Sequence, residues 1–188
     1  MGSEYKLLSI TLKTPRQIQK ALNREGAAGW RVRGVAASFL FLEKIGEERE
    51  GKIASITLNG PRGILKKIRK QAAEGWEVGG FGASFVFFDR SKKGSGEREY
   101  RMESITLRTP AGVQKLANSL GAEGWRLVAM GPSLAVFERG KGAYVHKLES
   151  ITLRPPGAIQ ALLNRRAAEG WTLGDASRNF AAFSRNAQ

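Results

Sequence analysis

The chain has 188 residues, of which 41% are hydrophobic and 26% charged, so it falls among globular proteins and not among disordered chains. It contains no Cys and a single His, which excludes disulfides, thiol catalysis and any site that needs two imidazoles. Lys and Arg outnumber Asp and Glu by 31 to 17, and the resulting net charge of +14 favours polyanionic partners such as nucleic acid. Alternatively, the positive charge serves only to keep the protein soluble, and this interpretation stays open.

No apolar run approaches the roughly 20 residues that cross a bilayer, and the first residues lack the pattern of a signal peptide. We therefore expect a cytoplasmic protein with no membrane partner, as a monomer or small homo-oligomer. No pattern typical of a cofactor or metal site is present, so we expect neither.

One unit is repeated four times along the chain. The tetrapeptide Ser-Ile-Thr-Leu begins at Ser9, Ser55, Ser104 and Ser150. A Gly-Trp pair ends at Trp30, Trp76, Trp125 and Trp171. Both series are spaced 46, 49 and 46 residues apart. The chain therefore divides into repeats 1–46, 47–92, 93–140 and 141–188.

Each repeat is predicted to begin with a strand. Ser-Ile-Thr-Leu alternates polar and apolar residues with period two, and we expect its Ile and Leu, such as Ile10 and Leu12, to point into the core. A Pro follows in every repeat, and Thr14 stands before the first of them as a helix N-cap does. Apolar side chains at helical spacing come next, as at Ile18 and Leu22.

The helix is predicted to end at a Gly, and two more strands follow it. Gly29 and its counterparts stand where a left-handed cap requires Gly, and Trp30 and its counterparts begin the second strand as core residues. The third strand, such as Phe-Val-Phe-Phe at 85–88, is apolar on both faces. We therefore place it in the middle of its sheet, antiparallel to both neighbours.

The predicted fold class is α+β: four tandem β-α-β-β repeats that form a pseudo-symmetric two-lobed body, each sheet with strand three central. A single repeat without disulfides is too small to fold alone, so the second apolar face of each sheet should pack against another repeat. The wider middle spacing pairs the repeats into lobes 1–90 and 99–188, joined by a Gly- and charge-rich linker at 91–98.

The stretch Ala-Ala-Glu-Gly-Trp-Glu-Val at 72–78, echoed at 121–127, resembles the signature of a family of short bacterial domains of unknown function. In that family a helix ends in Ala-Glu-Gly-Trp-Glu-Leu-Val. The resemblance covers each repeat from its first strand to its third and implies the same order of elements, without implying any activity. The first repeat departs from the signature, because Ala28 stands where the other repeats have Glu74, Glu123 and Glu169.

The leading functional hypothesis is a non-enzymatic nucleic-acid-binding protein that contacts mainly the phosphate backbone and has weak sequence preference. Each repeat has a net positive charge, and the helices carry many cations on their outer faces with few acidic neighbours. Whether the nucleic acid is single- or double-stranded stays open. The candidate nucleic-acid-binding residues are Arg16, Lys20, Arg24, Arg31, Arg33, Arg62, Lys66, Lys67, Arg69, Lys70, Arg108, Lys115, Arg126, Arg154, Arg165 and Arg166.

Two other readings remain. The chain is alternatively a structural or protein-interaction scaffold built from pseudo-tetrameric repeats, or a small-anion binder at the repeat junctions. The pattern Ser-x-Thr-x-Lys/Arg, as in Ser9, Thr11 and Lys13, places two hydroxyls and a cation on one face of the first strand. That face suits either a phosphate site or a cross-strand interface.

An enzymatic reading finds little support. The carboxylates at the helix ends are isolated, Asp175 has no evident partner, and His146 is expected in an exposed connector. No set of residues fills the named roles of a catalytic site, so we expect no catalytic residues and no enzymatic activity.

Overall fold

The computed structural model of the chain describes residues 3–36, 38–94, 96–177 and 179–187. Within them each repeat has one strand, one 13-residue helix and two further strands. Repeat 1 contains β1 (Tyr5–Ser9), α1 (Pro15–Ala27), β2 (Trp30–Ala36) and β3 (Phe39–Lys44). Repeat 2 contains β4 (Arg49–Ser55), α2 (Pro61–Ala73), β5 (Glu77–Phe81) and β6 (Phe85–Ser91). Repeat 3 contains β7 (Tyr100–Ser104), α3 (Pro110–Ala122), β8 (Trp125–Met130) and β9 (Leu134–Arg139). Repeat 4 contains β10 (Tyr144–Ser150), α4 (Pro156–Ala168), β11 (Thr172–Ala176) and β12 (Phe180–Asn186).

The third strand of every repeat lies in the centre of its sheet, as predicted. The strand orders are β1-β3-β2, β4-β6-β5, β7-β9-β8 and β10-β12-β11, and all these pairings are antiparallel. Each central strand is buried along at least four successive residues, so both of its faces are covered. The α+β class with four β-α-β-β repeats is confirmed.

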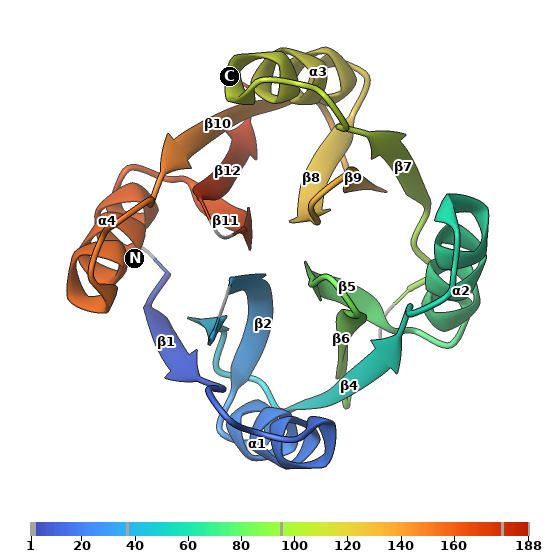
Figure 1. The fold of residues 1–188 in the computed structure, drawn as a ribbon, viewed down its shortest axis with the longest axis vertical. Coiled ribbons are helices and arrows are strands. Elements are labelled where there is room, and N and C mark those ends of the chain that lie inside the picture. The colour runs from blue at the N-terminus through green and yellow to red at the C-terminus, as the bar shows by residue number, and fades with distance from the viewer. Residues whose placement is uncertain (1–2, 37, 95, 178, 188) are drawn as a thin grey trace.

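The four repeats close into a ring (Figure 1). The second strands β2, β5, β8 and β11 surround the axis of this ring, and each contacts the next, with β11 closing onto β2. The helices lie outside, and each packs against the first strand of the following repeat, including α4 against β1. Rotation about the axis relates equivalent residues, so four copies of one surface position lie in one plane.

The helices begin and end as the sequence predicts. Each has Pro in its first turn, and the Thr14 hydroxyl accepts the Gln17 N–H at 3.3 Å while the Gln17 side chain accepts the Thr14 N–H at 2.8 Å. This reciprocal capping fixes where α1 starts. After the helix Gly29 has φ +79°, a left-handed conformation that Gly adopts without strain.

The interfaces between a helix and the following first strand alternate around the ring. In α1 the position nearest β4 is Gly26, where a Cβ would collide with the carbonyl oxygen of Arg49, and α3 has Gly121 at the same place. The equivalent residues of α2 and α4 are Ala72 and Ala167. The Gly interfaces join repeat 1 to 2 and repeat 3 to 4, which are the pairs that the spacing suggested. Both pairs belong to one closed ring, so the division into lobes remains an interpretation.

Helix side chains cover the open edge of the next first strand. Gln19 and Asn23 of α1 bond to the backbone of Gly51 and Ile53 in β4. Gln and Asn at the same positions of α3 and α4 bond to the backbone of β10 and β1. These contacts satisfy backbone groups that would otherwise template pairing with another chain.

The first strand differs from the prediction. It lies upstream of Ser-Ile-Thr-Leu, and β1 includes only Ser9 of that tetrapeptide. The chain then turns, because the Ile10 carbonyl accepts the N–H of Lys13 at 3.1 Å. Leu12 therefore does not enter the core as expected. His146 was also placed wrongly: it lies inside β10 and is 3% exposed.

Candidate docking face

Each repeat exposes one leucine completely. The exposed fractions of Leu12, Leu58, Leu107 and Leu153 are 99, 101, 100 and 99%. Isolated apolar residues on a surface are ordinary. Here, however, the same residue is fully exposed at four equivalent positions, and the symmetry of the ring puts all four in one plane.

The backbone of these leucines is also unfavourable. Their φ angles are +57, +68, +63 and +57°, and within the described residues no other non-Gly residue has a positive φ. The left-handed conformation costs a residue with a Cβ ~1–2 kcal/mol. In each turn Leu is the third of four residues, a place that favours Gly or Asn when φ is positive. Neither packing nor backbone preference accounts for leucine there.

The leucine turns are joined to the hairpins between the second and third strands. The N–H of Ile10 donates to the Ser38 carbonyl at 2.7 Å, and that of Ile105 donates to Ser133 at 2.9 Å. Turns and hairpins therefore share one side of the ring. We call this side the leucine face and define it as residues 9–20, 55–66, 104–115 and 150–161 with hairpin residues 38–39, 82–85, 131–134 and 179–180.

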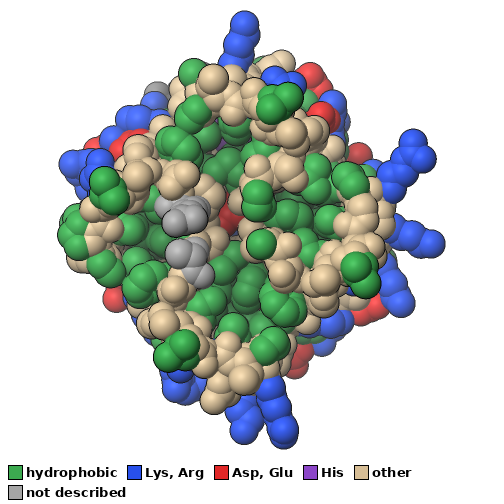
Figure 2. All heavy atoms as spheres, in the orientation of Figure 1, with side chains coloured by type: hydrophobic (Ala, Val, Ile, Leu, Met, Phe, Trp, Pro, Cys, Tyr) green, Lys and Arg blue, Asp and Glu red, His purple; other side chains and the backbone are tan. Residues whose placement is uncertain are grey.

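The leucine face carries cations and no carboxylates. None of the chain's 17 Asp and Glu falls in the segments that define it. Its eight Lys and Arg are all exposed: Lys13, Arg16, Lys20, Arg62, Lys66, Arg108, Lys115 and Arg154. Figure 2 shows the ring along its axis, with hydrophobic side chains over much of the middle, a small acidic spot at the very centre, and Lys and Arg projecting at the rim. The face is therefore apolar at its centre and positive around it.

The hydroxyl groups of the repeated tetrapeptide form hydrogen bonds within the turn. Ser9 Oγ lies 3.1 Å from Thr11 Oγ1, and the equivalent pairs in the other repeats lie 3.3 Å apart. The Thr106 and Thr152 hydroxyls also donate to hairpin carbonyls. The residues of Ser-x-Thr-x-Lys/Arg thus lie in a turn and do not form the extended strand face that was expected.

Three of the candidate nucleic-acid-binding arginines point into the protein. Arg33 is 5% exposed, and its Nε lies 2.6 Å from a Glu43 carboxylate oxygen. Arg31 contacts the same carboxylate at 3.6 Å, and Arg126 lies 2.9 Å from Glu138. Arg33 is buried and the other two are half-buried, and all three are engaged by carboxylates of the chain itself.

The remaining candidates lie on the helices. Four have partners within the chain: Arg24 with Glu25, Lys67 with Ser55 and Asn59, Arg69 with Tyr100, and Arg166 with Glu149 and Glu169. Lys70 and Arg165 have no side-chain partner in the described part of the chain. Because the helices face outward in four directions (Figure 1), the structure does not gather their cations on one surface.

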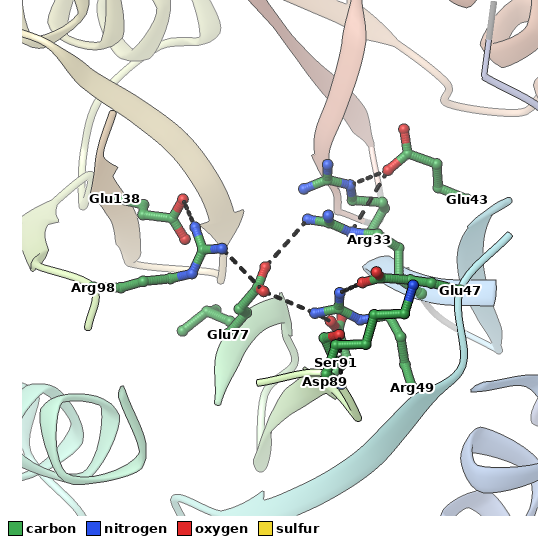
Figure 3. Close-up of polar contacts among 12 residues, drawn as sticks. Arg33, Glu43, Glu47, Arg49, Glu77, Asp89, Ser91, Arg98 and Glu138 are labelled. Atoms are coloured by element: carbon green, nitrogen blue, oxygen red, sulfur yellow. Dashed lines mark hydrogen bonds and ion pairs between the residues drawn. The ribbon is translucent and has the colours of Figure 1, made fainter. Parts of the chain in front are cut away.

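The three inward-pointing arginines belong to an ion-pair network built around buried carboxylates (Figure 3). At its centre is the Glu77 carboxylate in β5, which lies 2.9 Å from Arg49, 3.0 Å from Arg98 and 3.7 Å from Arg31. Arg98 continues to Glu138 at 2.9 Å. These arginines come from repeats 1, 2 and 3, so the network ties three repeats together. Removing one member of such a network costs ~3–5 kcal/mol, because a buried charge then loses its partner.

The network also fixes the charge of its carboxylates. Burial acts to raise the pKa of Glu43, but Arg33 and Arg31 outweigh it and hold that pKa at about 2. For Asp89 burial prevails and raises the pKa, although Arg31 and Arg49 oppose it. Glu43, with its lowered pKa, therefore stays ionised in neutral and mildly acidic solution.

A carboxylate that sequence reasoning missed lies on the axis of the ring. Asp175 in β11 is 0% exposed, and its oxygens accept backbone N–H groups from all four repeats. The donors are Val35 at 3.3 Å, Met130 at 2.5 Å, Ala176 at 2.7 Å, and Phe81. Burial raises the pKa of Asp175 well above its usual range, and these N–H groups act against that shift.

The four N–H groups converge because every second strand has a bulge at the same place. Asp175 stands where the other repeats have Gly34, Gly80 and Ala129. A Cβ on Gly34 would lie 2.6 Å from Asp175 Oδ1, so the axis has room for one carboxylate only. The one signal in the sequence was a charged residue where its counterparts are small.

Within the described residues no group of three or more His, Asp and Glu is placed to hold a metal ion. No helix in the described part is long and apolar enough to cross a membrane. Comparison with family models, with curated proteins and with solved structures finds no match to this chain.

Proposed function

We propose that this protein is a non-enzymatic docking protein that binds an anionic lipid surface through its leucine face. The observation that supports this most is the set of four fully exposed leucines, held in left-handed backbone on a face without carboxylates. A strained, exposed leucine gains nothing within the chain, so its stabilising contact lies outside.

A bilayer matches both properties of the face. Its headgroups attract the cations, each worth ~1 kcal/mol close to an anionic leaflet, and its hydrocarbon receives the leucines, each worth ~1.5 kcal/mol or more when removed from water. Because the four leucines lie in one plane, a planar partner can take all of them at once. Insertion and charge together give reversible binding that neither would secure alone.

Nucleic acid is the partner expected from net charge, and it remains the second candidate. The outer face of α2 favours it, since Arg62, Lys66 and Lys70 are exposed and have no carboxylate partner in the described residues. A phosphate backbone, however, offers no apolar surface to the leucines. The lipid proposal therefore departs from the expectation of no membrane partner, which rested on the lack of a spanning segment and of a signal-peptide pattern.

The test is co-sedimentation with vesicles. The intact protein should bind vesicles of phosphatidylcholine mixed with phosphatidylserine, bind vesicles of phosphatidylcholine alone weakly, and lose binding as salt rises. A variant with Leu12, Leu58, Leu107 and Leu153 all changed to Asn should fold, because Asn tolerates a positive φ, and should lose most of the binding. The matched control changes the same four leucines to Met, which keeps an apolar side chain and should keep binding.

The same preparations are titrated with single- and double-stranded oligonucleotides. Binding to oligonucleotides that the Leu→Asn variant retains, without binding to anionic vesicles, would replace the lipid proposal with the nucleic-acid one. In that case Lys66→Ala with Lys70→Ala should weaken binding and reduce its salt dependence.

A further inference from the structure

A cavity of about 700 Å³ opens on the leucine face, and residues of repeats 3 and 4 form most of its lining, joined by Phe81 to Ala83 of repeat 2 and Val35 of repeat 1. Its volume lies within the ~300–1,000 Å³ range of sites for small ligands. Most of its wall is apolar and comes from Phe81, Ile105, Val113, Met130, Leu148 and Phe180. The cavity therefore suits a hydrocarbon group that arrives from the leucine face.

The polar groups of the cavity are few and lie at its edge. Arg108 lines it and is exposed, and its Nε donates to the Ser104 carbonyl at 3.3 Å, which holds the side chain close to its own turn. Ser177 and Asn179 line it from repeat 4. No carboxylate is among the lining residues, and Arg108 has no ion pair within the described part of the chain. Among the described lining residues, an apolar wall with one unpaired cation fits a ligand that has a hydrocarbon chain and an anionic head.

We propose that this cavity binds the hydrocarbon chain of a single-chain anionic amphiphile, with the head group at Arg108. The proposal rests on the docking function, because the amphiphile is drawn from the lipid surface that the leucine face contacts. It adds a specific binding site to a face that otherwise attaches without selecting a lipid.

The pseudo-symmetry supplies the control for the head group. Arg154 follows Leu153 in repeat 4 as Arg108 follows Leu107 in repeat 3, yet Arg154 does not line the cavity. Both side chains are exposed, and each substitution to Gln removes one positive charge from the leucine face. A difference between Arg108→Gln and Arg154→Gln therefore reports the cavity and not the charge of the face.

The test uses monododecyl phosphate below its micelle concentration and protein labelled with ¹³C at the methionine methyl groups. Met130 lines the cavity, whereas Met102 packs against a different hydrophobic cluster. We expect a saturable, one-to-one change in the Met130 signal with Met102 unmoved. Inorganic phosphate and dodecyltrimethylammonium should leave the Met130 signal unchanged or shift it only at far higher concentration.

Two variants test the site. Leu148→Trp places a larger side chain from half-buried β10 in the cavity and should lower the affinity at least tenfold. Arg108→Gln should lower it several-fold, and Arg154→Gln should not change it. An unmoved Met130 signal, or equal binding by the intact protein and Leu148→Trp, would overturn the proposal.

Vesicle co-sedimentation of the same variants separates this site from the docking function. Leu148→Trp keeps all four leucines and should still bind anionic vesicles. Vesicle binding without a Met130 response would reject the cavity site and leave the docking function standing. A Met130 response in a protein that does not bind vesicles would reject the docking function and leave the cavity site standing.

Discussion

The imidazole Nε2 of His146 in repeat 4 accepts the backbone N–H of Leu127 in repeat 3 at 3.0 Å. Tyrosine hydroxyls accept the equivalent N–H groups at two other junctions: Tyr5 accepts that of Leu173, and Tyr100 accepts that of Val78. Each contact ties the first strand of one repeat to the second strand of the preceding one. Of these three acceptors, only the imidazole changes its charge in mildly acidic solution.

Acid should therefore weaken the ring at the His146 junction. Burial lowers the pKa of His146 from 6.5 to about 4 because it disfavours the charged ring, and the nearby positive charge of Arg126 acts in the same direction. The stability that this group contributes is fully present above pH 6.5 and is lost as the pH falls towards 4. We expect the contribution of His146 to the free energy of unfolding in urea, taken as the difference between the intact protein and a variant without the imidazole, to fall by about 2 kcal/mol between pH 7 and pH 5.

His146→Gln is the matched variant, since its side-chain oxygen can accept the same N–H and does not titrate. It keeps the pH dependence of every other group, including the raised pKa values of Asp89 and Asp175, and lacks the loss due to His146. Glu43, with its pKa at about 2, loses its contribution only below that interval. An equal loss of stability in the variant and the intact protein would show that another group is responsible.

Asp175→Gly should leave a small anion site on the axis. The variant restores the residue that repeats 1 and 2 carry and leaves the N–H groups of Val35, Phe81 and Met130 without an acceptor, so we expect a loss of about 3 kcal/mol or more. Added sodium formate supplies a carboxylate and should raise the melting temperature of the variant selectively. Sodium chloride at equal ionic strength and the intact protein are the controls. No loss in the variant, or equal effects of both salts, would contradict this role.

Two Gly→Ala substitutions in helices should have opposite signs. Ala is the better helix former by ~1 kcal/mol, so Gly63→Ala in the first turn of α2, where the nearest atom is a flexible Asn59 side chain at 3.4 Å, should stabilise the protein. Gly26→Ala in α1 should destabilise it, because its Cβ would collide with the backbone of Arg49 in repeat 2. Thermal unfolding of both variants measures the difference. Equal effects would mean that α1 does not pack on β4 as closely as described.

The strain in the leucine turns can be measured without any ligand. At Leu107, with φ +63°, Gly avoids the cost of the left-handed conformation and Ala does not. Leu107→Gly should therefore be more stable than Leu107→Ala by about 1 kcal/mol, the reverse of the usual order in helices and strands. The midpoints of chemical denaturation of the two variants measure this difference. An Ala variant as stable as the Gly variant would show that the backbone at Leu107 is not strained.

The sequence predicted well what depends on local pattern. Thr14 and Gly29 mark the ends of α1 because caps are set by nearby backbone, and the two-sided apolar pattern of Phe85–Phe88 placed the third strand in the centre of its sheet. The prediction of a strand at Ser-Ile-Thr-Leu was wrong, because alternation of polar and apolar residues over four positions does not distinguish a strand from a turn that follows a strand. Leu12 was assigned to the core for its apolarity, and only the positive φ reveals its exposure.

The candidate site was less accessible to sequence reasoning. The charge excess was read from the whole chain, whereas the structure takes Arg33 inside and leaves Arg108 on a face free of carboxylates. Which cations are engaged depends on contacts between repeats, such as Arg98 with Glu77, that no local pattern contains. Asp175 gave no signal of its function because its four donors come from segments far apart in the chain.

The entry of the leucines into a bilayer can be measured directly because the chain has no Cys. Single variants Leu12→Cys, Leu58→Cys, Leu107→Cys and Leu153→Cys are labelled with the environment-sensitive dye NBD, and Lys141→Cys, an exposed residue between β9 and β10 at the opposite ends of the strands, serves as control. On addition of phosphatidylserine-containing vesicles the NBD emission of all four leucine-site variants should shift to the blue and brighten, and that of the control should not change. Unchanged emission at the four leucine sites, with the control variant behaving alike, would contradict the proposal that the leucine face docks on lipid.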